Sequence, residues 1–203
     1  MTRPRLSTAT PLSINDVTYY LVTDGSGHVD KFGGWAAELR NPRSDADCHF
    51  LCGASAGTGE VYRMEFTALL EALTFLFNHA NYWGNNALSM LARNPMTIEW
   101  YNDNEALVNS VRRDPVSLQP LSRRDTYRDL WARFEWFEQY IRFNAIHLPR
   151  ETPEMKMVDW YASSCREMIK GFTGANTYST VLESMVKVER EKIEQSNSDV
   201  SDA

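Results

Sequence analysis

Apolar and polar positions alternate near the start of the chain in a pattern that is typical of β-strands. Three runs rich in β-branched and aromatic residues are separated by short segments that carry Gly, Pro, Asn and Asp. The strands are predicted over residues 17–23, 32–39 and 48–54. Because the connections between them are short, we expect the three strands to form an antiparallel meander.

Farther along the chain, helical periodicity alternates with two more strand-like runs. Residues 61–79 predict a helix that is buried on one face, since their apolar residues recur at helical spacing. Residues 81–95 look irregular, and residues 112–127 look like a basic loop. The remaining predicted elements are strands over 96–101 and 141–148 and helices over 105–111, over 129–140 and from about residue 158.

This order of elements predicts an α/β fold in which a mixed sheet carries helices on its faces. A length of 203 residues with 43% hydrophobic content suits one domain with extensions at both ends. We assign 1–16 to a flexible leader, 17–172 to the domain, and 173–203 to a C-terminal extension that is partly helical and then disordered.

Charge and composition narrow the classes of function. The net charge is -6, so contacts with nucleic acid need a local basic patch or bound metals rather than a basic surface overall. The three cysteines form no metal-binding pair, and we interpret Cys48, Cys52 and Cys165 as reduced, core or half-buried thiols. No secretory signal or membrane span is expected, which indicates a cytoplasmic protein without membrane contact.

Four carboxylates stand near predicted strand ends or helix starts, namely Asp24, Glu65, Asp103 and Asp159. Each alone has an ordinary structural interpretation, as a turn residue, a helix cap or an acid in the first turn of a helix. Gathered in one cleft, they would repel one another strongly unless cations held them. The pattern therefore predicts a site for two hard divalent metals, a kind of site that cleaves phosphodiesters.

The local sequences around these acids resemble those of the ribonuclease H family, and the likeness runs from about Thr18 to Lys170. The last loop is nearest to the bacterial and plant members that carry a Val-Pro-Arg-Glu segment. The matching motifs, in chain order, are Thr23-Asp24-Gly25-Ser26, Gly33-Gly34-Trp35, Arg63-Met64-Glu65, Asn102-Asp103-Asn104, Asp129-Leu130-Trp131 and Leu148-Pro149-Arg150-Glu151.

The resemblance implies a five-stranded mixed sheet, with three antiparallel strands followed by two parallel ones and with helices on both faces. It also implies an endonuclease that hydrolyses the RNA strand of RNA/DNA hybrids with two Mg²⁺ ions, for which Mn²⁺ would substitute. The catalytic and metal-binding residues would be Asp24, Glu65, Asp103 and Asp159. The substrate-binding residues would be Ser26, Arg63, Asn104 and Arg150.

Several neighbours of the motifs differ from the family pattern. Val61-Tyr62 stands where the family often has Asn, Asn104-Glu105 stands where it often has Ser-Gln, and Met155 stands where the related subgroup has Asn. The loop before the last acid holds no His. These replacements bear on the preference for hybrids more than on metal binding. The alternatives are a catalytically weak or inactive nucleic-acid-binding or structural module, and another nuclease on the same fold.

Some residues keep two interpretations. The arginines between 112 and 128 could contact phosphate, although solvated charge is the commoner role of such a run. Most tryptophans are expected in the core rather than as platforms for base stacking. We expect a monomer whose partner is nucleic acid, with a protein partner conceivable through residues 173–203.

Overall fold

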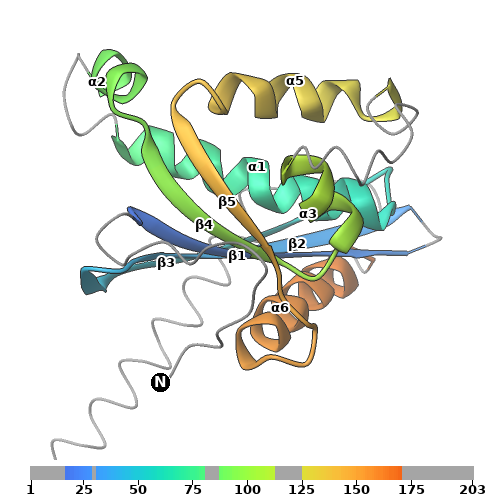
Figure 1. Cartoon of the computed structure of the whole chain (residues 1–203). Helices are drawn as coiled ribbons and strands as arrows, with labels where there is room; N and C mark the ends of the chain where they lie inside the picture. Colours follow the sequence, from blue (N-terminus) through green and yellow to red (C-terminus); the bar gives the residue numbers. More distant parts are fainter. Residues whose placement is uncertain (1–16, 29–30, 81–86, 113–124, 171–203) are drawn as a thin grey trace, which may run out of the picture.

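The structure, a computed structural model, describes residues 17–28, 31–80, 87–112 and 125–170. A five-stranded sheet runs through its centre in the order β3-β2-β1-β4-β5 (Figure 1). β1 pairs antiparallel with β2, and β2 with β3, whereas β4 lies parallel to both β1 and β5. The expected mixed sheet is therefore confirmed. Its strands are β1 (Tyr19–Gly27), β2 (Phe32–Asn41), β3 (Ser44–Ala56), β4 (Met96–Asn102) and β5 (Ile141–His147).

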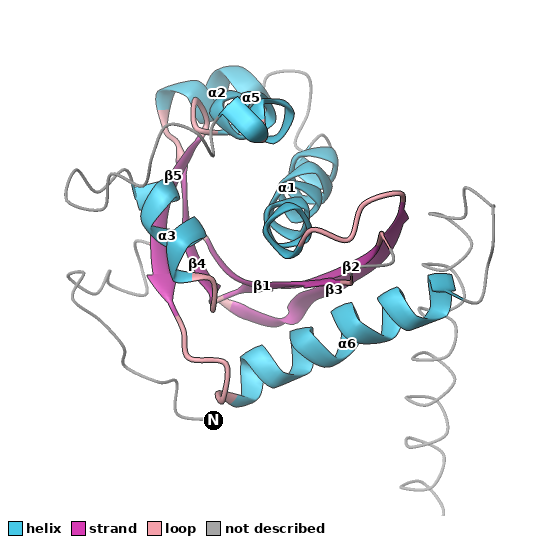
Figure 2. Cartoon of the chain, turned by 90° about the vertical axis from the view of Figure 1, so that its right-hand side faces the viewer, coloured by secondary structure: helices cyan, strands magenta, loops and turns pink. Residues whose placement is uncertain are grey.

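Helices cover both faces of this sheet, as expected. The long helix α1 (Val61–Ala80) crosses one face over β1 and β2, and α6 (Pro153–Lys170) crosses the opposite face over β1, β2 and β3 (Figure 2). On the α1 side, α5 packs against α1 and α3 packs against β5. The shorter helices are α2 (Ala87–Arg93), α3 (Glu105–Arg112) and α5 (Arg128–Phe137).

The sheet separates two apolar cores. Adjacent residues of β1 point to opposite faces, so Leu21 packs in the core on the α1 side and Val22 in the core on the α6 side. The larger core is rich in aromatic rings, and Phe66 of α1 meets Trp131 and Phe134 of α5. The predicted apolar stripe of α1 is buried in this core.

Several predicted boundaries were wrong. Residues 81–95 were expected to be irregular, yet α2 forms within them, because a seven-residue helix is too short to give a clear periodic signal. β1 does not end at Thr23 but continues to Gly27, since Asp24 and Gly25 remain paired with Ala36 and Trp35 of β2. β3 is longer than predicted at both ends, because its pairing with β2 continues from Ser44 to Ala56.

The last helix also begins earlier than expected. α6 begins at Pro153 rather than near Val158, since proline is well tolerated in the first turn of a helix. Asp159 consequently lies in the second turn of α6 and is not a first-turn acid. The leader 1–16 and the extension 173–203 lie outside the described residues.

Candidate metal centre

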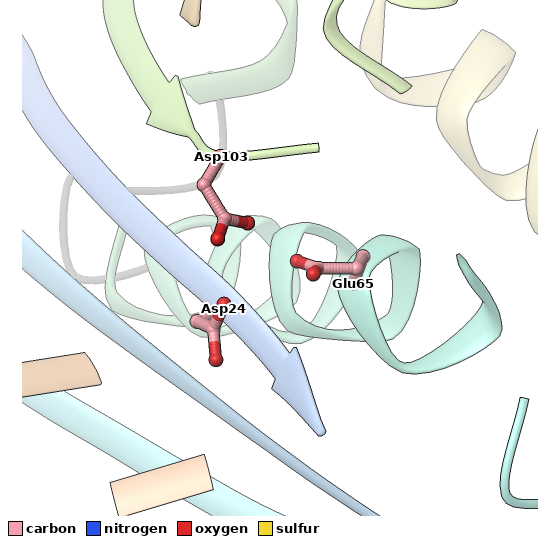
Figure 3. A group of neighbouring side chains, drawn as sticks. All are labelled: Asp24, Glu65 and Asp103. Atoms are coloured by element: carbon pink, nitrogen blue, oxygen red, sulfur yellow. The ribbon is translucent and has the colours of Figure 1, made fainter. Parts of the chain in front are cut away.

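Three carboxylates from distant parts of the chain converge at one end of the sheet. Asp24 comes from β1, Glu65 from α1, and Asp103 from the turn that follows β4 (Figure 3). One oxygen from each lies within 4.8 Å of the others. Asp24 and Glu65 are 2% and 3% exposed, and Asp103 is half-buried. The sequence prediction that these acids lie together is confirmed for these three residues.

The close approach of α1 to β1 places Glu65 beside Asp24. Gly25 makes this approach possible, because a β-carbon at this position would stand 2.1 Å from the backbone nitrogen of Glu65. The parallel pairing of β1 with β4 brings Asp103 to the same edge, since parallel strands end at the same side of a sheet. Three separate elements thus fix the three acids.

Asn102 holds this arrangement in place. Its side chain is fully buried, and its amide nitrogen donates to Glu65 Oε2 at 2.8 Å and to the backbone oxygen of Thr23 at 2.8 Å. Its side-chain oxygen accepts a hydrogen bond from the backbone nitrogen of Asn104 at 2.9 Å. Sequence reasoning missed this role, although Asn102 directly precedes Asp103 in the motif Asn102-Asp103-Asn104. A polar residue at the end of a buried strand was the available signal.

Burial raises the pKa of these carboxyl groups. Burial, reinforced by the charges of Asp103 and Asp159, raises the pKa of Asp24 from 3.8 to about 8. Burial and the charge of Asp24 raise the pKa of Glu65 well above its ordinary value, against the hydrogen bond from Asn102. Burial also raises the pKa of Asp103. Without a cation, the cluster therefore tends to keep protons.

The residues fit a divalent cation. Asp24 Oδ2 is buried and has no hydrogen-bond partner within the described part of the chain, which is costly for a carboxylate oxygen. The donors are all oxygens, as hard cations such as Mg²⁺ and Mn²⁺ prefer. Asp24, Glu65 and Asp103 could hold such an ion, which would remove both the repulsion and the cost of burial.

Asp159 lies beside this group but is not one of the three converging acids. Its side chain is 30% exposed and forms an ion pair with Arg150 through Oδ1. The same guanidinium lies near Asp103, with 3.9 Å between Arg150 Nε and Asp103 Oδ2. The charge of Asp159 contributes to the raised pKa of Asp24 and of Asp103, so the fourth acid acts on the same site electrostatically.

The four residues expected at the substrate are dispersed. Arg150 lies beside the acids, as described. Ser26 contacts α6, where its hydroxyl lies 2.6 Å from Arg166 and 3.2 Å from Ser163. Arg63 forms a two-pronged ion pair with Asp129 of α5, at 2.7 and 3.2 Å. Asn104 accepts a hydrogen bond from the backbone nitrogen of Leu107 at 3.1 Å and so caps α3.

His147 contacts the segment that carries Asp103. It is the last residue of β5, and its Nε2 lies 3.0 Å from the backbone oxygen of Asp103. Its charge opposes the rise in the pKa of Asp103. His147 therefore supports the segment that carries Asp103.

Only some of the tryptophan and cysteine side chains expected in the core are buried there. Trp100 and Trp131 are core residues, but Trp136 and Trp160 are 43% and 58% exposed, because they lie on the outer faces of their helices. Cys52 and Cys165 are buried, as expected. Cys48, in the N-terminal half of edge strand β3, is exposed, contrary to expectation.

Most of the basic loop lies in 113–124, outside the described residues, and so does Trp83, which lies in 81–86. Arg112 donates to the backbone oxygen of Ala145 at 2.6 Å, and Arg128 is highly exposed. No helix in the described ranges is both long and apolar enough to cross a membrane.

Comparison with known proteins relates the chain to solved structures alone. No family model matches the sequence, and no curated protein matches it. LC11 ribonuclease H1, isolated from compost and solved in complex with an RNA/DNA hybrid, matches with a TM-score of 0.55 and 16% identity. That match covers 74% of this chain and 98% of the other.

Two further structures give similar values. The N-terminal ribonuclease H domain of Rv2228c from Mycobacterium tuberculosis matches with a TM-score of 0.53 and 13% identity, over 78% of this chain and 99% of the other. The foamy viral protease-reverse transcriptase in complex with double-stranded DNA matches with a TM-score of 0.54 and 14% identity, over 78% and 99%. At these identities the likeness establishes the ribonuclease H-like fold.

Proposed function

We propose that this protein is a metal-dependent endonuclease that hydrolyses the RNA strand of RNA/DNA hybrids. The observation that carries the proposal is the convergence of Asp24, Glu65 and Asp103 around the unpartnered, buried Oδ2 of Asp24. A fold alone does not decide a function, since one scaffold supports many chemistries. The chemistry of this site is what favours metal-dependent hydrolysis of a phosphodiester.

Each acid has a role in this proposal. Asp24 would be the central ligand, Glu65 and Asp103 would complete one cation site, and Asp159 would contribute with Asp24 to a second. Bound Mg²⁺ ions would supply Lewis-acid activation of a water and of the phosphate group. Asn102 keeps Glu65 in place, and burial of Asp24 and Glu65 limits the access of bulk water. The products would carry 5′-phosphate and 3′-hydroxyl ends.

The choice of a hybrid substrate rests on two supports. The motifs around the acids resemble those of ribonuclease H, and LC11 ribonuclease H1, which shares the fold, was solved with an RNA/DNA hybrid. In such enzymes 2′-hydroxyl contacts across the wide minor groove would distinguish RNA from DNA. Arg150 is 63% exposed beside the acids, and we propose that it contacts substrate phosphate. Ser26, Arg63 and Asn104 are proposed substrate contacts as well.

A cleavage assay tests the proposal. We expect the protein to cleave labelled RNA/DNA hybrid in Mg²⁺, and Glu65→Gln and Asp103→Asn to lower the rate at least about 100-fold, or roughly 2.7 kcal/mol. Glu71→Gln is the matched control, because Glu71 lies on the same helix but pairs with Arg133 of α5. Absence of Mg²⁺-dependent cleavage by the wild type, or equal rates in the acid variants and the control, would contradict the proposal.

The alternative of an inactive nucleic-acid-binding or structural module is favoured by one observation, namely that Arg150 already neutralises part of the acidic cluster. Calorimetry separates the two, because the module would bind neither Mg²⁺ nor Mn²⁺. Another nuclease on the same fold would cleave duplex RNA or duplex DNA as fast as the hybrid. Including both duplexes in the assay therefore distinguishes all three functions.

A further inference from the structure

Arg150 bridges two of the acids. It lies between β5 and α6, in the turn that follows Leu148 and Pro149. One terminal nitrogen of its guanidinium pairs with Asp159 Oδ1, and its Nε lies 3.9 Å from Asp103 Oδ2. The two carboxylates come from different elements, and the guanidinium reaches both.

The positive charge of Arg150 affects the pKa values of the neighbouring acids. The hydrogen bond and charge of Asp159, and the charges of Asp103 and Asp24, raise the pKa of Arg150. In return, Arg150 opposes the rise in the pKa of Asp24 and of Asp103. The guanidinium therefore acts as a built-in counter-ion for acids that would otherwise repel one another.

The two parts of the site differ in how open they are to a cation. In the group of Asp24, Glu65 and Asp103, Asp24 Oδ2 has no partner in the ranges that the structure describes, so a cation gains a ligand without displacing one. At Asp159, which would hold the second cation together with Asp24, a cation would meet an oxygen that is already paired with a guanidinium, and that guanidinium also lies near Asp103. Two positive groups cannot share that space without strong repulsion. Arg150 and a second cation are therefore alternative occupants.

The pair can open readily. The Arg150 side chain is 63% exposed, and ion pairs of such exposure contribute little to stability and are screened by salt. The phosphates of a nucleic acid offer a competing anion, to which a planar guanidinium binds well. Arg150 can thus leave the acids when substrate arrives, without disturbing the core.

We propose that Arg150 is a positioning residue that holds Asp159, the acid that would bind the second cation together with Asp24, until a substrate phosphate draws the guanidinium away. This inference rests on the proposed function and adds an order of assembly to it. The free protein takes up one divalent cation at Asp24, Glu65 and Asp103. The second binds tightly only when Arg150 has moved, so full loading of the site is coupled to substrate.

The test is calorimetric titration of the full chain with Mn²⁺ in the absence of nucleic acid. We expect one tighter and one weaker site in the wild type, and Arg150→Ala to tighten the weaker site about fivefold, which corresponds to roughly 1 kcal/mol. Arg133→Ala is the matched control, since it removes the same charge from an exposed ion pair with Glu71 and should change neither site. Raising the salt concentration should shrink the difference between Arg150→Ala and wild type.

Arg150→Lys gives a second measure, because it keeps the charge but loses the planar fork, and it should fall between wild type and Arg150→Ala. Circular dichroism of each variant checks that the fold is kept. Identical weaker-site affinity in wild type and Arg150→Ala would overturn this inference while leaving the proposed function standing. Absence of any Mn²⁺ binding by the wild type would overturn the proposed function itself.

Discussion

Glu65, a buried acid, is held by a hydrogen bond that a single neutral side chain provides. Asn102 is fully buried and donates to Glu65 and to Thr23 through one amide nitrogen. A neutral donor steadies the carboxylate without adding a positive charge that would compete with a metal. Arg150, by contrast, is exposed and charged, and it can leave. The site therefore combines a fixed neutral support with a movable cationic one.

At this scale the raised pKa of Asp24 predicts how stability depends on pH without metal. Because the pKa is about 8 in the folded chain and near 3.8 when unfolded, the folded state keeps a proton that the unfolded state has lost between these values. The free energy of unfolding should therefore fall as pH rises from about 4 to about 8, by up to about 1.4 kcal/mol per pH unit for one proton. Denaturant titrations in EDTA measure this slope.

Asp24→Asn provides the comparison, because an amide at this position does not titrate. Its unfolding free energy should depend less steeply on pH than that of the wild type over the same range. Parallel curves for the two proteins would show that Asp24 titrates normally. Saturating Mn²⁺ should flatten the wild-type curve, since a bound cation replaces the proton.

Residue types and flanking motifs were enough to identify the acids from sequence, but not their supports. Asp24, Glu65 and Asp103 stand in recognisable local sequences. The pairing of Arg63 with Asp129 joins residues 66 positions apart, so it depends on how α5 packs against α1. The contacts of Asn102 likewise exist only after β1, β4 and α1 have met. Such partners follow from tertiary packing, which a local pattern does not carry.

At the scale of elements, two glycines let helices approach the sheet from opposite sides. A β-carbon at Gly25 would stand 2.1 Å from the Glu65 nitrogen, and one at Gly34 would stand 2.0 Å from the Ala162 oxygen. The obstacles are backbone atoms, which cannot turn aside as a flexible side chain can. The two glycines occupy neighbouring positions in the pairing of β1 with β2, since Gly25 lies opposite Trp35 and Gly34 lies opposite Ser26. Both helices are thus seated directly on the backbone of the sheet.

We expect Gly25→Ala to lower the free energy of unfolding by at least about 3 kcal/mol, because overpacking against a rigid backbone strains the core. It should also weaken Mn²⁺ binding, since α1 must shift and Glu65 moves with it. Gly57→Ala is the comparison: its β-carbon meets open space, and its φ of 99° costs only about 1–2 kcal/mol. Denaturation and Mn²⁺ titration of both variants measure the effects.

If Gly25→Ala binds Mn²⁺ as well as Gly57→Ala does, the approach of α1 does not control the site.

Gly25 also explains why the end of β1 was predicted wrongly. Asp-Gly is a common turn signal, but here the glycine makes room for a helix within a continuing strand. The start of α6 was missed for a related reason, since Pro153 begins the helix rather than preceding it.

At the scale of the whole molecule, order of elements was the most predictable feature. Three short-linked strands followed by strand-helix units leave few ways to build one sheet, so the mixed topology could be predicted. The net charge of -6 adds a constraint, because a nucleic acid must approach a protein of the same sign. Cations at the acidic cluster would relieve that repulsion where the substrate has to bind.

The domain boundaries predict that residues 17–172 fold and bind metal without the rest of the chain. The described buried core runs from Val17 to Ile169, so the shortened chain keeps all of it. We expect its thermal midpoint to stay within about 4 °C of the full chain, the shift that roughly 1 kcal/mol would cause in a domain of this size. Calorimetry and Mn²⁺ titration of both chains provide the measurement. A large loss of stability would place part of the core in 1–16 or 173–203.

The two glycine contacts also influence the spacing between acids of the site that are carried by different helices. Glu65 arrives on the helix above the sheet and Asp159 on the helix below, and Gly25 and Gly34 set how near each helix can come. The span between the two acids therefore depends on these two contacts with the backbone. Side chains in either core can then change by mutation while the spacing of the ligands stays constant. The tolerance of the fold to mutation is thereby separate from the tolerance of the chemistry to mutation.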